Sequence, residues 1–246
     1  MISISTGTLW PYGLDRIFKI VKQAGFESLE LLLVSKNSNA FFDTWDDRYI
    51  KGLIKRHNLP VSSIHAHFEF ESGREKLDDL VDLSNKIGAK RIIIHIPRED
   101  QKDYLEVFNK EFFSYTKKSP LLLAENVHIK EGKADPIYLK DADFNKLPSM
   151  CFDVAHALRS GIDPKKSISA LNNIFQIHLS DWDGKEDHMN ILNRKAYYRE
   201  LLSIRKIDAV CLELCPKIFK DIYDQEEIVK TLSEINKFVK DTIGSK

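Results

Sequence analysis

The chain has 246 residues, of which 43% are hydrophobic and 30% are charged, and its 37 basic residues balance its 37 acidic residues. No apolar run approaches the roughly 18 residues that a membrane-spanning helix needs, and the first residues lack the basic and apolar regions of a signal peptide. The zero net charge provides no basic field for nonspecific nucleic-acid binding. Three cysteines without CxxC spacing are typical of reduced thiols, so we expect a cytoplasmic protein.

Eight short runs rich in Ile, Val or Leu are the predicted strands. Runs of this length and composition are typical of buried parallel strands. They are Ile2–Thr6, Ser28–Val34, Val61–His67, Arg91–Ile96, Pro120–Glu125, Met150–Asp153, Ile174–Leu179 and Ala209–Leu214.

Amphipathic patterns predict helices between many of these runs. Gly25 and Gly88 are expected to end the first two helices. The polar segment Ser35–Asp47 is the expected mobile lid. The predicted helices are Leu14–Ala24, Leu77–Ile87, Tyr104–Tyr115, Ala134–Leu147, Tyr197–Ile204 and Ile228–Val239.

The alternation of strands and helices predicts a single (β/α)8 TIM barrel over residues 1–246. Eight units in this chain average about 31 residues each, which is the size of a βα unit. The alternative, an open doubly wound sheet, usually carries a Gly-rich phosphate loop after its first strand. The segment Thr6–Pro11 contains no GxGxxG, and no linker or low-complexity segment divides the chain.

Polar residues end six consecutive predicted strands, where barrel enzymes place their active sites. With period-two alternation, Glu125 shares a face with Leu123, and the last polar residues of the next three strands can also point into the barrel mouth. Three carboxylates in one mouth repel each other unless a cation lies among them. Carboxylates together with histidine favour Zn, Mn or Co, with Mg as an alternative. The candidate ligands are Glu125, Asp153, His178 and Glu213.

Other strand-end residues have two open interpretations. His67, His95, His156 and His188 are candidates for additional metal or substrate contacts, or are hydrogen-bonded structural residues. The same two interpretations apply to His65. Glu30 lies in the middle of the second predicted strand, where it either points into the barrel towards the site or forms an internal salt bridge.

The ordered motifs GFESLELLL, IHAHF, RIIIHIP, LLLAEN, CFDVAHA, QIHLSD and CLELCP resemble the xylose isomerase-like TIM barrel superfamily over nearly the whole chain. This superfamily contains sugar isomerases and epimerases and the AP endonucleases of the endonuclease IV type. The resemblance implies a metal site of Glu125, Asp153, His178 and Glu213, with the two glutamates as acid and base in the isomerase branch. The endonuclease branch binds three zincs, and its extra ligands would match His67, His95, His156, Glu186 and His188.

Three features differ from the pattern of the superfamily. The segment His188–Arg194 has no glycine, where both branches often carry a Gly-containing turn. Position 186 is Glu, where the endonucleases have Asp, and the chain is shorter than typical endonucleases of this type. These differences bear on whether the site is active and on whether it receives DNA.

The leading hypothesis is a divalent-metal-dependent isomerase or epimerase of a small sugar or polyhydroxy carbonyl compound. Glu125 and Glu213 would transfer a proton at the carbon next to a polarised carbonyl. One alternative is a metal-dependent phosphodiesterase of the endonuclease IV type, which the extra histidines favour and the neutral charge disfavours. Another is a non-catalytic ligand-binding barrel. The expected partner is a small-molecule carbohydrate in preference to DNA, and homo-oligomerisation stays open.

Overall fold

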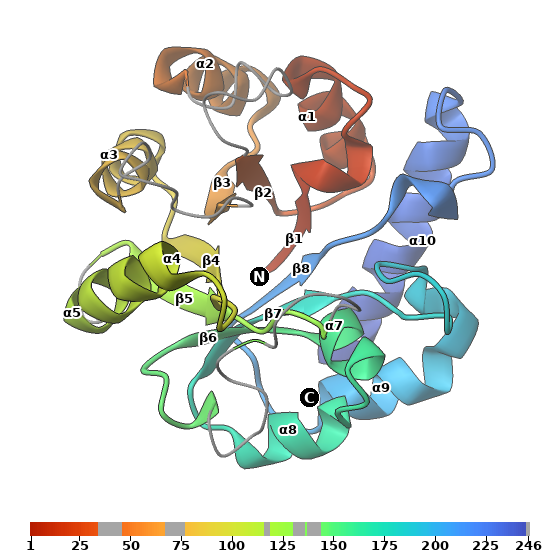
Figure 1. Cartoon of the computed structure of the whole chain (residues 1–246). Helices are drawn as coiled ribbons and strands as arrows, with labels where there is room; N and C mark the ends of the chain where they lie inside the picture. Colours follow the sequence, from red (N-terminus) through yellow and green to blue (C-terminus); the bar gives the residue numbers. More distant parts are fainter. Residues whose placement is uncertain (34–45, 67–76, 116–118, 130–135, 137–143, 245–246) are drawn as a thin grey trace.

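A closed barrel of eight parallel strands forms the centre of the molecule (Figure 1). The computed structural model describes residues 1–33, 46–66, 77–115, 119–129, 136 and 144–244. The strands pair in chain order, and the last also pairs with the first, so the predicted (β/α)8 barrel is confirmed. They are β1 (Ile2–Ser5), β2 (Ser28–Leu33), β3 (Val61–Ala66), β4 (Arg91–His95), β5 (Leu121–Glu125), β6 (Met150–Asp153), β7 (Ile174–Leu179) and β8 (Ala209–Leu212).

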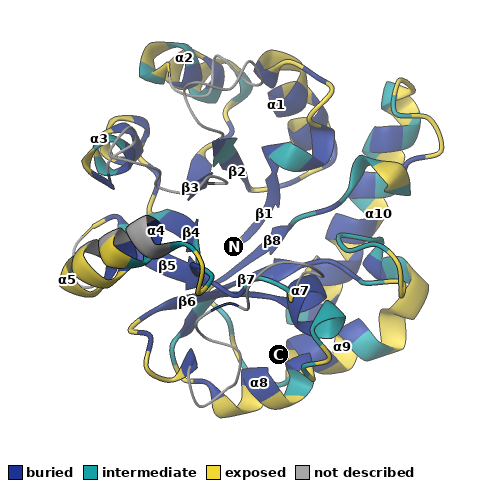
Figure 2. Ribbon diagram, viewed as in Figure 1, coloured by how far each residue is buried: buried dark blue, intermediate teal, exposed yellow. Residues whose placement is uncertain are grey.

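Helices surround the barrel, and their apolar faces pack against its outer side (Figures 1 and 2). In α10, for example, Ile228, Leu232 and Ile235 are fully buried, and each such side chain contributes roughly 1.5–3 kcal/mol to folding. No helix in the described ranges is both long enough and apolar enough to span a membrane. The α-helices are α1 (Leu14–Gln23), α2 (Asp47–His57), α3 (Leu77–Ile87), α4 (Lys102–Val107), α5 (Phe113–Tyr115), α7 (Val154–Arg159), α8 (Pro164–Ala170), α9 (Lys195–Ser203) and α10 (Gln225–Gly244).

Three helices were not predicted, and each has a short or sparse apolar face. Helix α2 buries only Ile50 and Leu53, and it begins where the Asp46 carboxylate accepts hydrogen bonds from two backbone N–H groups. Helices α7 and α8 have six and seven residues, too few to show a clear period. The predicted helix Tyr104–Tyr115 is interrupted by a π-helical turn at Phe108–Phe112.

Some expectations fall outside the described residues. These are His67, nearly all of the expected lid Ser35–Asp47, and most of the expected helix Ala134–Leu147.

The side chains inside the barrel lie in layers, which follow from the alternation of each strand. Ile93, Leu123 and Cys151 form a small apolar cluster of their own. Two residues further along the same strands stand His95, Glu125 and Asp153. The register pairs His95 with Glu125 and Asp153 with His178, whereas Glu125 pairs with Cys151, so the polar positions shift by two residues between β5 and β6.

Candidate metal centre

The four expected ligands converge above the apolar layer of the barrel. Glu125 and Asp153 end β5 and β6, His178 is the penultimate residue of β7, and Glu213 directly follows β8. The His178 Nδ1 atom lies 2.7 Å from Glu213 Oε2, 3.3 Å from Glu125 Oε2 and 4.0 Å from Asp153 Oδ2. Every pair among the four brings possible ligand atoms within 4.8 Å of each other.

The facing atoms of these side chains lack hydrogen bonds. Within the described part of the chain, none reaches either carboxylate oxygen of Glu125, Asp153 Oδ2, His178 Nδ1 or Glu213 Oε2. Three of the side chains are completely buried, and that of Glu213 is 15% exposed. Buried polar atoms without hydrogen bonds are rare and costly. A cation between them would satisfy these oxygen and nitrogen atoms together, so the donor set fits a divalent metal.

The surroundings of Glu125 and Glu213 shift their pKa values in opposite directions. Burial raises the pKa of Glu125 to about 8, against the opposing pull of the His178 charge. Burial would also raise the pKa of Glu213, yet the positive charges of His178 and His65 outweigh it and hold this pKa well below its usual range. For His178, burial lowers the pKa but the surrounding thiol and carboxylates raise it well above its usual value. The metal-free site therefore holds one protonated and one ionised glutamate.

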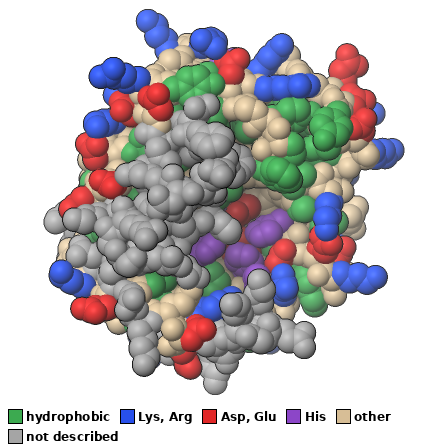
Figure 3. Space-filling model, turned by 45° about the horizontal axis from the view of Figure 1, so that its top comes forward, with side chains coloured by type: hydrophobic (Ala, Val, Ile, Leu, Met, Phe, Trp, Pro, Cys, Tyr) green, Lys and Arg blue, Asp and Glu red, His purple; other side chains and the backbone are tan. Residues whose placement is uncertain are grey.

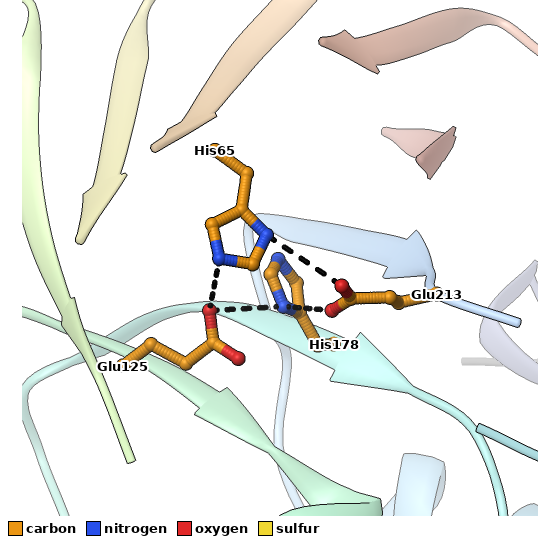
Figure 4. A group of neighbouring side chains, drawn as sticks. All are labelled: His65, Glu125, His178 and Glu213. Atoms are coloured by element: carbon orange, nitrogen blue, oxygen red, sulfur yellow. Dashed lines mark ion pairs between the residues drawn. The ribbon is translucent and has the colours of Figure 1, made fainter. Parts of the chain in front are cut away.

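His65 takes part in a group of four possible ligands, with Glu125, His178 and Glu213 (Figure 4). Its Nε2 atom lies 3.1 Å from Glu125 Oε2, and its Nδ1 atom lies 3.6 Å from Glu213 Oε1. The sequence left the role of this residue open, because it is adjacent to stronger candidates. His65 is the penultimate residue of β3, and this position near the strand end is the sequence signal that could have identified it.

The other predicted histidines stand around this group. His95 Nε2 lies 3.1 Å from His65 Nε2 and 4.0 Å from Glu125 Oε2. His156 Nδ1 lies 3.5 Å from Glu125 Oε1 and 2.9 Å from the Asn126 carbonyl oxygen. His188 Nδ1 lies 3.1 Å from the backbone carbonyl oxygen of Glu213.

Glu186 does not join the group. Its exposed carboxylate pairs with the Lys217 ammonium, with a distance of 2.6 Å to Oε2. The next residue, Asp187, lies closer to the centre: its Oδ2 is 2.5 Å from Arg159 and 3.7 Å from His128 Nδ1.

His128 was not predicted as a site residue, because it lies three residues beyond β5. With His156 and Asp187 it forms a further group of possible ligands. Burial lowers the pKa of His128 to about 4, so its ring is neutral at physiological pH.

The superfamily often has a glycine-containing turn after the position of His188, and this chain has no glycine in the segment His188–Arg194. The turn that precedes His188 does contain a glycine. Gly184 has φ +97°, and His188 itself has φ +60°, a left-handed conformation that is uncommon for a histidine. The backbone here is held by hydrogen bonds from Met189 N to Asp181 O and from Cys215 N to His188 O. The histidine therefore stays over the barrel mouth.

Glu30 points into the barrel, one layer below the four expected ligands. Its Oε2 atom accepts hydrogen bonds from Ser63 Oγ at 2.7 Å and Gln176 Nε2 at 2.6 Å, and its Oε1 atom lies 3.0 Å from His178 Nε2. Burial would raise the pKa of Glu30, yet the charge and contact of His178 outweigh it and lower this pKa to about 2. Glu30 therefore fits both interpretations from the sequence: it points into the barrel towards the site, and it forms an internal salt bridge, with His178.

The centre lies at a hollow in the molecular surface. Figure 3 shows histidine side chains gathered in this hollow next to an acidic side chain. The partial exposure of Glu213 and of His95, at 15% and 23% of their side chains, fits this position.

Sequence comparison finds distant relatives. No family model matches the chain. An uncharacterised protein of Mycobacterium leprae is 25% identical over 130 residues, which are 50% of this chain and 45% of that protein. A second uncharacterised protein, from Mycobacterium tuberculosis, is 24% identical over the same length. The chain thus matches somewhat under half the length of these curated relatives.

Solved structures share the fold over nearly their whole length. A xylose isomerase domain protein of Salmonella typhimurium has a TM-score of 0.68 and 12% identity, over 97% of this chain and 96% of that chain. The 3-keto-D-glucoside 4-epimerase of E. coli has a TM-score of 0.67 and 12% identity, over 96% and 98%. Endonuclease IV of Thermus thermophilus has a TM-score of 0.64 and 15% identity, over 98% and 99%.

A zinc-bound protein is also among these neighbours. The IolI protein, solved with a zinc atom, has a TM-score of 0.65 and 13% identity, over 99% of this chain and 98% of that chain. At such identities the likeness shows the fold alone. At that level the resemblance to the xylose isomerase-like barrels is confirmed, in both its isomerase and its endonuclease branches.

Proposed function

We propose that this protein is a divalent-metal-dependent isomerase or epimerase of a small sugar or polyhydroxy carbonyl compound. The observation that carries the proposal is the convergence of Glu125, Asp153, His178 and Glu213, whose facing atoms receive no hydrogen bond from the described residues. The shared fold with a sugar epimerase supports the choice of substrate class.

Four side chains would hold the metal: Glu125, Asp153, His178 and Glu213. Their mixture of carboxylate and imidazole favours Zn, Mn or Co, with Mg as the alternative, and a structural neighbour that binds zinc supports this choice. A bound divalent ion supplies a Lewis acid that polarises the substrate carbonyl and stabilises the negative charge that develops on its oxygen.

The two glutamates provide an acid and a base. Glu213 is ionised and partly exposed to the hollow, so it can accept the proton of a substrate carbon. Glu125 holds a proton in the metal-free protein, releases it to bind the metal, and is closed off from solvent. Of two carboxylates at one site, the one that accepts a substrate proton can return it as an acid, which allows proton transfer in both directions.

The remaining residues of the mouth would orient the substrate. His95 and His188 lie beside the glutamates and carry ring N–H groups that can donate to hydroxyl oxygens of a sugar.

The three cysteines are free thiols. Such thiols are usual in a reducing compartment, so we propose that the protein acts in the cytoplasm.

The test is a metal analysis of protein purified without chelator, with the ions located by anomalous scattering, combined with a solvent-exchange assay. The assay follows exchange of carbon-bound hydrogen with deuterium from water, across a panel of ketoses and related hydroxy-carbonyl compounds. One metal held by the four residues, with exchange in at least one compound, is the expected result. Metal binding without exchange in any compound would contradict the proton-transfer role.

A second candidate function is a metal-dependent phosphodiesterase of the endonuclease IV type. The observation that favours it is the number of histidines near Glu125, whose Oε2 atom lies 3.1 Å from His65, 3.3 Å from His178 and 4.0 Å from His95. Such a ligand-rich carboxylate would suit a site with more than one metal ion, which would stabilise the attacking and leaving oxygens. Three metals per chain with incision of abasic DNA would favour this function over the isomerase.

A further inference from the structure

The Glu30 carboxylate lies inside the barrel, directly below the candidate metal centre. It is completely buried, in the middle of β2, and it is enclosed by side chains of other strands. Ser63 of β3 and Gln176 of β7 donate hydrogen bonds to its Oε2 atom. Its Oε1 atom faces two imidazoles, at 3.0 Å from His178 Nε2 and 3.8 Å from His65 Nδ1. Glu30 therefore has no path to a substrate and acts only through its neighbours.

The two nitrogens of His178 each face a carboxylate, Glu213 at 2.7 Å from Nδ1 and Glu30 at 3.0 Å from Nε2. A neutral imidazole keeps one N–H, and its other nitrogen offers a lone pair. When Nδ1 loses its proton to a metal, the N–H that stays on Nε2 has the Glu30 carboxylate as its acceptor. The Gln176 amide nitrogen is also 3.2 Å from Nε2, but it donates to Glu30 Oε2 at the shorter distance of 2.6 Å. The opposite tautomer would direct a lone pair at the Glu30 carboxylate and would close Nδ1 to a metal.

An alternative role for Glu30, as a metal ligand itself, fits the contacts less well. Glu30, His178 and Cys211 do bring possible ligand atoms within 4.8 Å of each other. However, the Glu30 Oε2 atom already accepts two hydrogen bonds, and the Cys211 thiol contacts the Leu212 carbonyl oxygen. The other oxygen, Oε1, lies 3.0 Å from His178 Nε2, so its nearest partner is the imidazole.

On the basis of the proposed metal-dependent function, we propose that Glu30 is a positioning residue that fixes the tautomer and orientation of His178 for metal binding through Nδ1. Metal-ligating histidines commonly donate their second N–H to a carboxylate, and loss of such a partner typically weakens metal binding by about 10–100-fold. Ser63 and Gln176 hold this carboxylate in place.

The principal test is Glu30→Gln, which keeps the size of the side chain and removes its charge. We expect the dissociation constants of Zn²⁺ and Co²⁺, measured by competition with a chromophoric chelator, to rise by about 10–100-fold. At saturating Co²⁺, the visible absorption spectrum should differ from that of the wild type, because the geometry of the His178 ligand has changed. A purely structural role for Glu30 would lower the melting temperature and leave both the affinity and the Co²⁺ spectrum of the folded protein unchanged.

Two serines of β3 provide a matched pair that leaves Glu30 intact. Ser63→Ala removes a hydrogen bond to the Glu30 carboxylate, and Ser62→Ala removes one from the neighbouring serine to the Leu29 carbonyl. We expect Ser63→Ala to weaken Co²⁺ binding by roughly twofold to tenfold, the contribution of one hydrogen bond. Ser62→Ala should leave Co²⁺ binding unchanged.

The outcomes separate this proposal from the proposed function. If the wild type binds metal and Glu30→Gln has the same affinity and spectrum, the positioning role is overturned and the metal-dependent function stands. If the wild type binds neither Zn²⁺ nor Co²⁺, both are overturned. If Glu30→Gln does not fold, the serine pair decides, and equal Co²⁺ affinities of Ser63→Ala and Ser62→Ala overturn the positioning role.

Discussion

The substitution Glu213→Gln tests the central assignment, that this residue transfers a proton as well as binding the metal. The change keeps the shape of the side chain and removes its charge and its basic oxygen. In the structure, Glu213 Oε2 lies 2.7 Å from His178 Nδ1, and its side chain is 15% exposed where that of Glu125 is fully buried. Glu213 is therefore the glutamate that a substrate in the hollow can reach.

The expected magnitude follows from this dual role. Loss of a positioned acid or base lowers turnover by roughly 10²–10⁴-fold, which corresponds to about 2.7–5.4 kcal/mol of barrier height. Loss of a ligand alone would weaken metal affinity, and excess metal would then restore turnover. The free energy of unfolding should fall, because the charges of His178 and His65 hold the pKa of Glu213 well below its usual range and the variant loses these favourable ion pairs.

The assay is exchange of substrate carbon-bound hydrogen with solvent, at a metal concentration that saturates both wild type and variant. Glu186→Gln is the matched control, since this exposed glutamate pairs with Lys217 outside the metal centre. It should keep wild-type exchange. Full exchange by Glu213→Gln at saturating metal would refute the proton-transfer role of Glu213.

Three other predictions concern pH, stability and nucleic acid. Zn²⁺ affinity, measured by chelator competition from pH 6 to 9, should rise with pH up to at least about 8, because both Glu125 and His178 must lose a proton to bind metal. Burial raises the pKa of Glu125 to about 8, and the surrounding carboxylates raise that of His178. A pH-independent affinity would contradict the assigned ligands. Tyr198→Phe should lower the free energy of unfolding, measured in urea, by about 1–3 kcal/mol, because the buried hydroxyl donates to Asp181 Oδ1 at 2.7 Å. An unchanged midpoint of urea unfolding would show that the Asp181 carboxylate does not need this hydrogen bond. Duplex DNA should bind weakly and with little preference for an abasic site, given the zero net charge; tight abasic binding with incision, compared at two salt concentrations, would reverse the ranking of the two candidate functions.

The barrel and its polar strand ends could be predicted from the sequence because both follow from local patterns. Each predicted strand starts and ends within two residues of the observed one, since near-continuous apolar runs are typical of strands buried on both faces. Alternation within the strand predicted that Leu123 and Glu125 share a face, and the structure has them in successive layers inside the barrel. The order of the strands then brought Glu125, Asp153, His178 and Glu213 to one end of the barrel.

Choices between neighbouring residues could not be made from local patterns. His65 and His67 are two residues apart in the sequence, and only contacts across the barrel show that His65 reaches Glu125 and Glu213. Glu186 and Asp187 are adjacent in a loop, where no period determines direction. Their separation, with Glu186 on Lys217 and Asp187 on Arg159, depends on partners that are about 30 residues away in the chain.

Depth along the strand separates the roles of chemically identical side chains. Glu213 follows the last residue of β8, so its carboxylate is at the hollow and can meet a substrate. Glu30 is the third of six residues of β2 and lies beside Ser63 in the register, so its carboxylate is enclosed by the barrel wall. A buried charge at that depth is stable only with several fixed partners, and those partners include His178. Under the proposed function, the enclosure that prevents Glu30 from reacting would let it hold His178 in one orientation for a metal, whereas the partial exposure of Glu213 would give that residue access to a substrate.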